Sequence, residues 1–190
     1  MPTPVLGAAF AAVLMMTISV PAAAQIPQSQ SRDAPGAGSA STAEQWFERL
    51  KKVQGTWRGA VTTSPAIPQM AGDTMKVVMR TTSLGNAILH NMTSARRPDD
   101  PITMIYLEND RLVLTHYCDA GNRPRMEGKL SSDGTTLTFD MVDISGPMKH
   151  GHMHRAVFSF VDDNHHVEEW SFKLPNGANM VARFDLQRVK

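Results

Sequence analysis

The stretch ITMIYLENDRLVLTHYC, residues 102–118, decides the fold of this chain. It contains two runs rich in Ile, Leu, Val, Thr and Tyr, separated by the polar turn Glu108–Asp110. Such residues favour strands, and Asn and Asp tolerate the backbone angles of tight hairpins. The stretch therefore predicts an antiparallel hairpin with strands at 102–108 and 111–118.

The same pattern recurs on both sides of this hairpin. Eight further strands are predicted at 54–63, 74–82, 86–93, 124–130, 135–142, 153–162, 165–174 and 179–188. Short connections rich in Gly, Asn and Asp force consecutive strands to pair antiparallel, because a parallel crossover needs a dozen or more residues. Closing such a meander on itself removes its two exposed edges. We therefore predict a mainly β fold, an antiparallel up-and-down barrel of about ten strands, with a two-sheet sandwich as the alternative.

Residues 42–53 follow a helical period instead. Thr42 can cap a helix, and Trp46, Leu50 and Val53 follow at spacings of four and three, which places them on one helical face. We expect this short N-terminal helix to cover one end of the barrel.

Residues 1–24 have the features of a signal peptide. An apolar, uncharged run ends in small residues, and cleavage is expected after Ala24. The first basic residue is Arg32, so the usual basic segment ahead of the apolar run is missing. A membrane anchor is the alternative, but the run is shorter than the ~20 residues that a bilayer requires. We expect a bacterial periplasmic or secreted protein whose mature chain has no integral membrane segment.

Composition constrains the mature chain further. Residues 25–42 are rich in Pro, Gly and Ser and are predicted to form a disordered linker, which leaves residues 43–190 as one barrel domain. The net charge is +1 and the Lys and Arg residues are scattered, so nucleic acid is not an expected partner. Cys118 is the single cysteine, so the chain forms no internal disulfide.

The stretch VQGTWRG, residues 53–59, opens the first predicted strand. Its Gly55 and Trp57 resemble the Gly-x-Trp signature of the calycins, which include lipocalins, fatty-acid-binding proteins and haem-binding nitrobindin-like barrels. The resemblance implies that Trp57 packs at the closed end of the barrel beside an arginine of the last strand, either Arg183 or Arg188. An arginine over an indole face is a favourable cation–π pair.

Residues 111–126 are similar to a segment of uncharacterised secreted bacterial proteins of a lipocalin-like kind. The function of those proteins is unknown. This second resemblance therefore bears on fold and location and leaves the function open.

His116 and Cys118 stand two residues apart in a predicted strand, so their side chains point to the same face. If that face is the interior, an imidazole and a thiol meet in an apolar cavity. There they could contact a ligand, hold a metal or haem, or form a reactive thiol beside a base. A metal site would need a further ligand such as His90, and Arg125 on the next strand could belong to a polar rim. The alternative is a buried cysteine beside a hydrogen-bonded histidine.

His150, His152 and His154 form the densest cluster of potential metal ligands. Histidine and thioether ligands suit copper, and alternation in an extended segment places the three imidazoles on one side. The alternative is a flexible connection that binds metal weakly and without purpose. Copper and haem are the cofactors that the histidines of this sequence suggest.

Glu168 and Glu169 are adjacent in a predicted strand, so one carboxylate faces each side of the sheet. An inward carboxylate could act as a general acid or pair with Arg183 on the next strand, and we take Glu169 and Arg183 as candidate ligand contacts. In fatty-acid-binding proteins an Arg-x-Tyr pair near the C-terminus holds the ligand carboxylate. Here Asp185 replaces the tyrosine, which argues against fatty-acid binding. If the apolar face of the last strand is the interior, Arg183 points outward.

These features predict an exported barrel that binds one small, mostly apolar or amphipathic molecule. Ten methionines follow the predicted signal peptide, and flexible methionines can line a cavity that adapts to apolar ligands. An enzyme that uses His116, Cys118 or a buried glutamate is one alternative, and periplasmic copper or haem binding through histidines is another. The sequence carries no phosphate-binding Gly loop, paired-cysteine zinc motif or Gly-x-Ser-x-Gly elbow.

Overall fold

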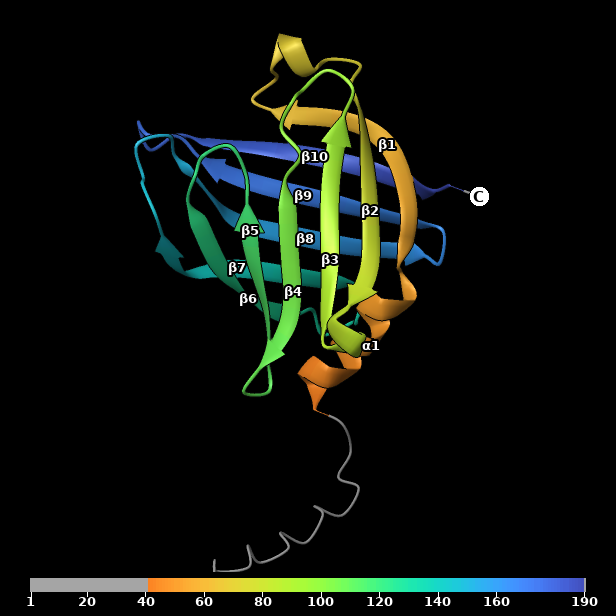
Figure 1. Ribbon diagram of the computed structural model, residues 1–190. Coiled ribbons are helices and arrows are strands. Elements are labelled where there is room, and N and C mark those ends of the chain that lie inside the picture. Colours follow the sequence, from red (N-terminus) through yellow and green to blue (C-terminus); the bar gives the residue numbers. More distant parts are fainter. Residues whose placement is uncertain (1–40, 190) are drawn as a thin grey trace, which may run out of the picture. The chain divides into compact units, whose positions relative to one another are not determined.

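The computed structural model of Figure 1 describes residues 41–189, which form a closed barrel preceded by a helix. The strands are β1 (Gly55–Ser64), β2 (Thr74–Thr82), β3 (Ala87–Ser94), β4 (Ile102–Glu108), β5 (Arg111–Tyr117), β6 (Arg123–Leu130), β7 (Thr136–Ser145), β8 (His152–Asp162), β9 (His165–Lys173) and β10 (Asn179–Arg188). Each pairs antiparallel with its neighbours in the sequence, and β1 pairs with β10 to close the barrel. The prediction of a ten-stranded up-and-down barrel is confirmed, and the two-sheet sandwich is excluded.

Turn chemistry and alternation build this barrel as the sequence indicates. Asn109 and Asp110 have φ angles of 49° and 58° in the β4–β5 hairpin, a conformation that few other residues tolerate. In β10, Phe184 and Leu186 are buried while Asp185 between them is exposed, so successive side chains alternate between core and solvent. The predicted signal peptide, residues 1–24, lies outside the described residues, as does the predicted linker up to residue 40.

The helix α1 (Thr42–Lys52) lies at one end of the barrel, and the short helix η1 (Pro68–Met70) lies at the other (Figure 1). The cap of α1 is Ser41 rather than Thr42. The Ser41 hydroxyl accepts from the Glu44 amide, and the Glu44 carboxylate accepts from the Ser41 amide, which forms a capping box. Trp46 packs against Phe160 of β8 with ring centroids 6.0 Å apart, so α1 covers its end of the barrel as expected.

Trp57 is fully buried at this closed end. Its indole Nε1 donates to the Val53 carbonyl over 3.0 Å, and the guanidinium of Arg188 lies 4.2 Å from the ring centroid. Arg188 is therefore the arginine that pairs with Trp57, and Arg183 is not. Gly55 has a φ of 141°, and a Cβ there would lie 2.7 Å from Arg188 Nη1, so a side chain at this position would displace the guanidinium.

Among residues 41–189, no helix is long and apolar enough to cross a membrane.

Candidate functional site

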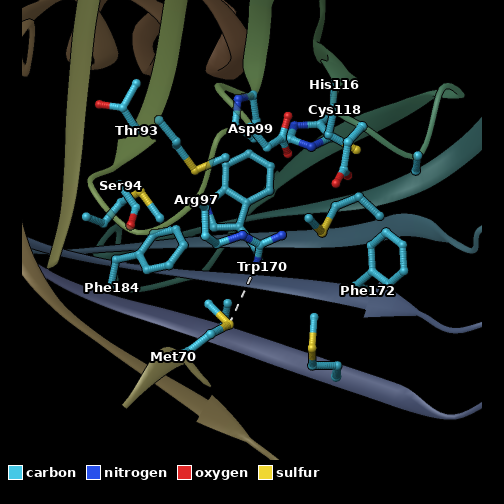
Figure 2. Close-up of a pocket in the computed structure, with 18 of the residues that line it drawn as sticks. Met70, Thr93, Ser94, Arg97, Asp99, His116, Cys118, Trp170, Phe172 and Phe184 are labelled. Carbon is cyan, nitrogen blue, oxygen red and sulfur yellow. Dashed lines mark hydrogen bonds between the residues drawn. The ribbon is translucent and has the colours of Figure 1, made fainter. Parts of the chain in front are cut away.

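A cavity of about 420 Å³ lies at the end of the barrel opposite α1 (Figure 2). The connections at this end form its mouth and contribute Arg97, Asp99, Asp119, Ala120, His150 and Leu174. In the close-up, the dashed line joins Arg97 to Met70 of η1, and the donor nitrogen is 3.7 Å from the sulfur. The mouth is thus polar and carries charges of both signs.

Thioether and aromatic side chains form the walls of the cavity. They come from β2, β3, β8, β9 and β10 and include Met75, Met92, Met153, Phe172, Met180 and Phe184. Methionine is unbranched and polarizable, so such walls can adjust to ligands of different shape. A register shift between Met153 and Arg155 marks a β-bulge in β8 beside the cavity.

His116 and Trp170 form the floor, because they are the most deeply buried of the side chains that line the cavity, with exposed fractions of 0% and 1%. Their rings lie against each other, with centroids 5.1 Å apart and an interplanar angle of 36°. His116 comes from β5 and Trp170 from β9, so the floor joins two strands that are not neighbours in the barrel.

A buried polar cluster adjoins this floor and shares Trp170 with it, and we call it the Glu168 cluster: Glu168, His90, His166 and Trp170. The Glu168 carboxylate accepts from His90 Nε2 at 3.0 Å, from His166 Nε2 at 3.0 Å and from Trp170 Nε1 at 2.9 Å. All four residues are at most 1% exposed. Three donors from three positions therefore converge on one carboxylate inside the barrel.

The environment of Glu168 keeps it ionised. Burial alone raises the pKa of a carboxyl group, but the nearby charge of His90 and the hydrogen bonds from His166 and His90 outweigh burial and hold the pKa of Glu168 below its usual range. Within the cluster, the indole N–H of Trp170 and one nitrogen of each imidazole are hydrogen-bonded to Glu168. What Trp170 offers to the cavity above is therefore an apolar ring without a free donor.

His116 differs from Trp170, the other residue of the floor. Its Nδ1 lies 2.8 Å from the hydroxyl of Thr103, which is opposite it in the register of β4 and β5. Its Nε2 is buried and has no hydrogen-bond partner among the described residues. Burial, and then the proximity of His90, lower the pKa of His116 from 6.5 to about 3, so its ring is neutral at neutral pH.

The predicted site residues divide into two groups. His116 and Cys118 both line the cavity, as their spacing indicates, and His90 lies below them in the Glu168 cluster. Cys118 is partly buried, and burial raises the pKa of its thiol. A raised pKa is the opposite of the shift that activates a cysteine nucleophile.

Three other predicted contacts do not line the cavity. Arg125 is exposed in part and pairs with Glu108 at 2.9 Å and with Asp143 at 2.6 Å. Glu169 and Arg183 face each other across β9 and β10 at 3.8 Å, and both side chains are more than 40% exposed. The inward carboxylate of the adjacent glutamates is Glu168 rather than Glu169.

The three clustered histidines do not converge on one point. His150 lies at the mouth of the cavity, His152 is nearly buried, and the rings of His152 and His154 are 6.3 Å apart. Within residues 41–189 no group of three or more His, Cys, Asp or Glu side chains is arranged to hold a metal ion. The imidazoles in the cavity lining, and so the candidates for a haem ligand, are His116 and His150.

Comparison with known proteins supports the fold. No protein-family model and no curated protein match the sequence. The structure is similar to the crystal structure of Rv2717c from M. tuberculosis, with 11% identity, a TM-score of 0.55, and coverage of 76% of this chain and 97% of that chain. It is also similar to a protein of unknown function from the DUF3598 family of Nostoc punctiforme, with 7% identity, a TM-score of 0.50, and coverage of 74% of this chain and 49% of that one. At these identities the likeness shows the barrel fold alone, and membership of the calycin families stays a prediction.

Proposed function

We propose that this protein binds one small, mostly apolar molecule in the cavity at the open end of the barrel. The observation that carries the proposal is the cavity itself, about 420 Å³ in volume and walled by methionine and phenylalanine side chains. Ligand pockets typically enclose roughly 300 to 1,000 Å³ and combine apolar walls with a few polar groups. This cavity has that size and that composition.

Three features support a container for one ligand. A small barrel of this kind has room for about one small molecule. The opposite end is blocked by α1 and by Trp57, so a ligand enters and leaves through the polar mouth. The Glu168 cluster spans the interior between the two ends and is fully buried, which limits how deep a ligand can reach.

A substitution that fills the cavity tests this function. Ala182 lines the cavity from β10, and Val181 beside it lies at the alternate position, which faces away from the interior. Both are changed to phenylalanine, as Ala182→Phe and Val181→Phe, and the proteins are titrated with the neutral dye Nile red by fluorescence. We expect Ala182→Phe to weaken binding by about tenfold or more and Val181→Phe to change it less than about twofold, because only the first ring occupies ligand space. Equal affinities in the two variants, or no dye binding by the unsubstituted protein, would overturn the proposal.

We also propose that the barrel acts outside the cytoplasm, on the basis of the apolar N-terminal segment and the small residues before Gln25. The full chain is expressed in a bacterium, and the protein from the periplasm and medium is sequenced from its N-terminus. A start at or near Gln25 supports export. A chain that stays in the cytoplasm with residues 1–24 attached contradicts it.

Haem is a second candidate, favoured by one observation: His116 lines the cavity, and its buried Nε2 has no partner among residues 41–189. Haem is added to the purified protein and to a His116→Phe variant, and the absorption spectra are compared. A haem spectrum typical of histidine ligation that is lost in the variant would identify the ligand as haem. A spectrum unchanged from free haem in both proteins would remove haem from consideration.

A further inference from the structure

We infer that the deep end of the ligand is an uncharged oxygen acceptor, such as a ketone, aldehyde or ether oxygen, which accepts a hydrogen bond from His116 Nε2–H. This inference rests on the proposed function, because it names the class of molecule that the cavity takes. It starts from the one buried polar atom of the floor that has no partner within the described chain, His116 Nε2.

The hydroxyl of Thr103 assigns the tautomer of His116. Thr103 is fully buried, and the one hydrogen-bond partner of its hydroxyl among residues 41–189 is His116 Nδ1, at 2.8 Å. A hydroxyl proton needs an acceptor, so Thr103 donates and Nδ1 accepts. In a neutral imidazole the proton then lies on the other nitrogen. His116, which lines the cavity, therefore carries its ring proton on the buried Nε2, a donor without an acceptor among the described residues.

The surroundings of the floor disfavour a negatively charged group there. His90, His166 and Trp170 each direct one N–H at the Glu168 carboxylate. Glu168 is itself an anion, separated from the cavity by the indole of Trp170. A carboxylate at the floor would therefore find one N–H, from the neutral ring of His116, because the donors of His90, His166 and Trp170 are directed at Glu168, and one such donor is too little to replace its hydration.

The cation of the cavity lies at the mouth instead. Arg97 lines the cavity there, and its contact in the close-up is to the sulfur of Met70 (Figure 2). An amphipathic molecule would place its apolar body between the methionine walls, its neutral oxygen on His116 and any anionic group near Arg97. The mouth thus offers one cation beside the carboxylates of Asp99 and Asp119, whereas the floor offers a neutral imidazole.

Three molecules of equal chain length distinguish a neutral oxygen from an anion and from no polar group at all: the methyl ketone of undecane, undecanoate, and undecane. Each is titrated into the full mature protein by competition with Nile red. The ketone is expected to bind about threefold to tenfold more tightly than the alkane, the range that one added hydrogen bond gives. Equal affinities for ketone and alkane would overturn the inference.

Variants of β5 locate the effect. His116→Phe removes the donor, and Tyr117→Phe, at the neighbouring exposed position, is the matched control. We expect His116→Phe to abolish the preference for ketone over alkane and Tyr117→Phe to retain it. Undecanoate affinity is expected to be unaffected by His116→Phe. If undecanoate binds more tightly than the ketone and loses this advantage in His116→Phe, the floor accepts an anion and the inference is wrong.

A measurement on the unsubstituted protein does not depend on how well the variants fold. Nitrogen chemical shifts of the His116 ring, read by NMR at neutral pH, should show Nε2 protonated and Nδ1 unprotonated, with the Nε2–H resonance shifting when the ketone is added. The opposite tautomer would overturn the inference. Failure of the proposed function looks different, because then none of the three molecules displaces Nile red.

Discussion

The two ends of the barrel are built from the same alternating strands but are filled in different ways. At the closed end, Trp57 is fully buried, its N–H is bonded to Val53, and Arg188 covers its ring. At the open end, methionine side chains surround a cavity, and His116 retains a nitrogen without a partner among residues 41–189. The closed end resembles an ordinary core, in which the N–H of the large buried indole has its hydrogen-bond partner.

The Glu168 cluster separates these two ends. It places an anion and its donors across the interior, where apolar side chains would otherwise pack. If the proposed function is right, stability depends mainly on the closed end and the cluster, while ligand binding depends on the cavity and on His116 above them. Each prediction below tests that separation, from the largest expected effect to the smallest.

Removing the charge at the centre of the cluster has the largest expected effect. Glu168→Gln leaves buried donors facing an amide that can accept far less, and we expect the free energy of unfolding to fall by about 3 to 5 kcal/mol, as when one partner of a buried ionic network is removed. Urea unfolding measures it. Glu169→Gln, one position away and exposed, is the control and should change stability by less than about 0.5 kcal/mol. Similar effects of the two changes would show that the cluster does not stabilise the barrel.

Acid should weaken the protein through His116. Its folded pKa is lowered from 6.5 to about 3, so between these values the unfolded state binds a proton that the folded state does not. Stability from this group is therefore complete above pH 6.5 and is lost as pH falls, by up to about 1.4 kcal/mol for each pH unit.

Urea unfolding at a series of pH values tests this dependence, with His116→Phe as the comparison. The lowered pKa of Glu168, held down by its donors against burial, adds a loss in the same direction at lower pH, below its ordinary value of 4.5. The variant should show a shallower decline between pH 6.5 and 4.5 than the unsubstituted protein. An equal slope in the two proteins would mean that His116 is not buried in its neutral form.

The closed end should respond to the loss of a single hydrogen bond. Trp57→Phe removes the indole donor to the Val53 carbonyl and weakens the contact with Arg188, and we expect a loss of about 1 to 2 kcal/mol in unfolding free energy with ligand affinity unchanged. Thermal and urea unfolding report the first quantity and Nile red titration the second. A loss of dye binding without a loss of stability would reverse the roles assigned to the two ends.

The smallest effect is expected for methionines. Met79 is 1% exposed within the packed interior, whereas Met180 borders the cavity. Met79→Leu should cost about 1 kcal/mol because a branched side chain must fit a filled space, and Met180→Leu should cost less than about 0.5 kcal/mol because empty volume lies beside it. A larger cost for Met180→Leu than for Met79→Leu would indicate that the open end is as tightly packed as the closed end.

The fold can be predicted from local patterns in the sequence. Period-two runs and turn residues such as Asn109 and Asp110 mark each hairpin, and antiparallel pairing then leaves few topologies. The position of Gly55 and Trp57 indicates the closed end, but the choice between Arg183 and Arg188 depends on the register of β10 against β1, in which Arg188 stands opposite Trp57.

The site is less visible in the sequence, because it depends on contacts between distant strands. Glu168 and His166 lie two and four residues before the buried Trp170, so the three side chains share one face of the strand. This spacing was the available signal for an inward Glu168. The approach of His90 to Glu168 joins residues 78 positions apart, and the Thr103–His116 pair depends on cross-strand register. Such contacts have no local pattern.

A crystal structure of the protein with the methyl ketone of undecane bound tests the central claim most directly. We predict electron density for the hydrocarbon chain of the ketone between the side chains of Met153 and Met180. The ketone oxygen should lie within hydrogen-bonding distance of His116 Nε2, and the structure around Trp57 should be unchanged. Density elsewhere on the barrel, or methionine side chains that fill the cavity and leave no space for the ligand, would contradict the account.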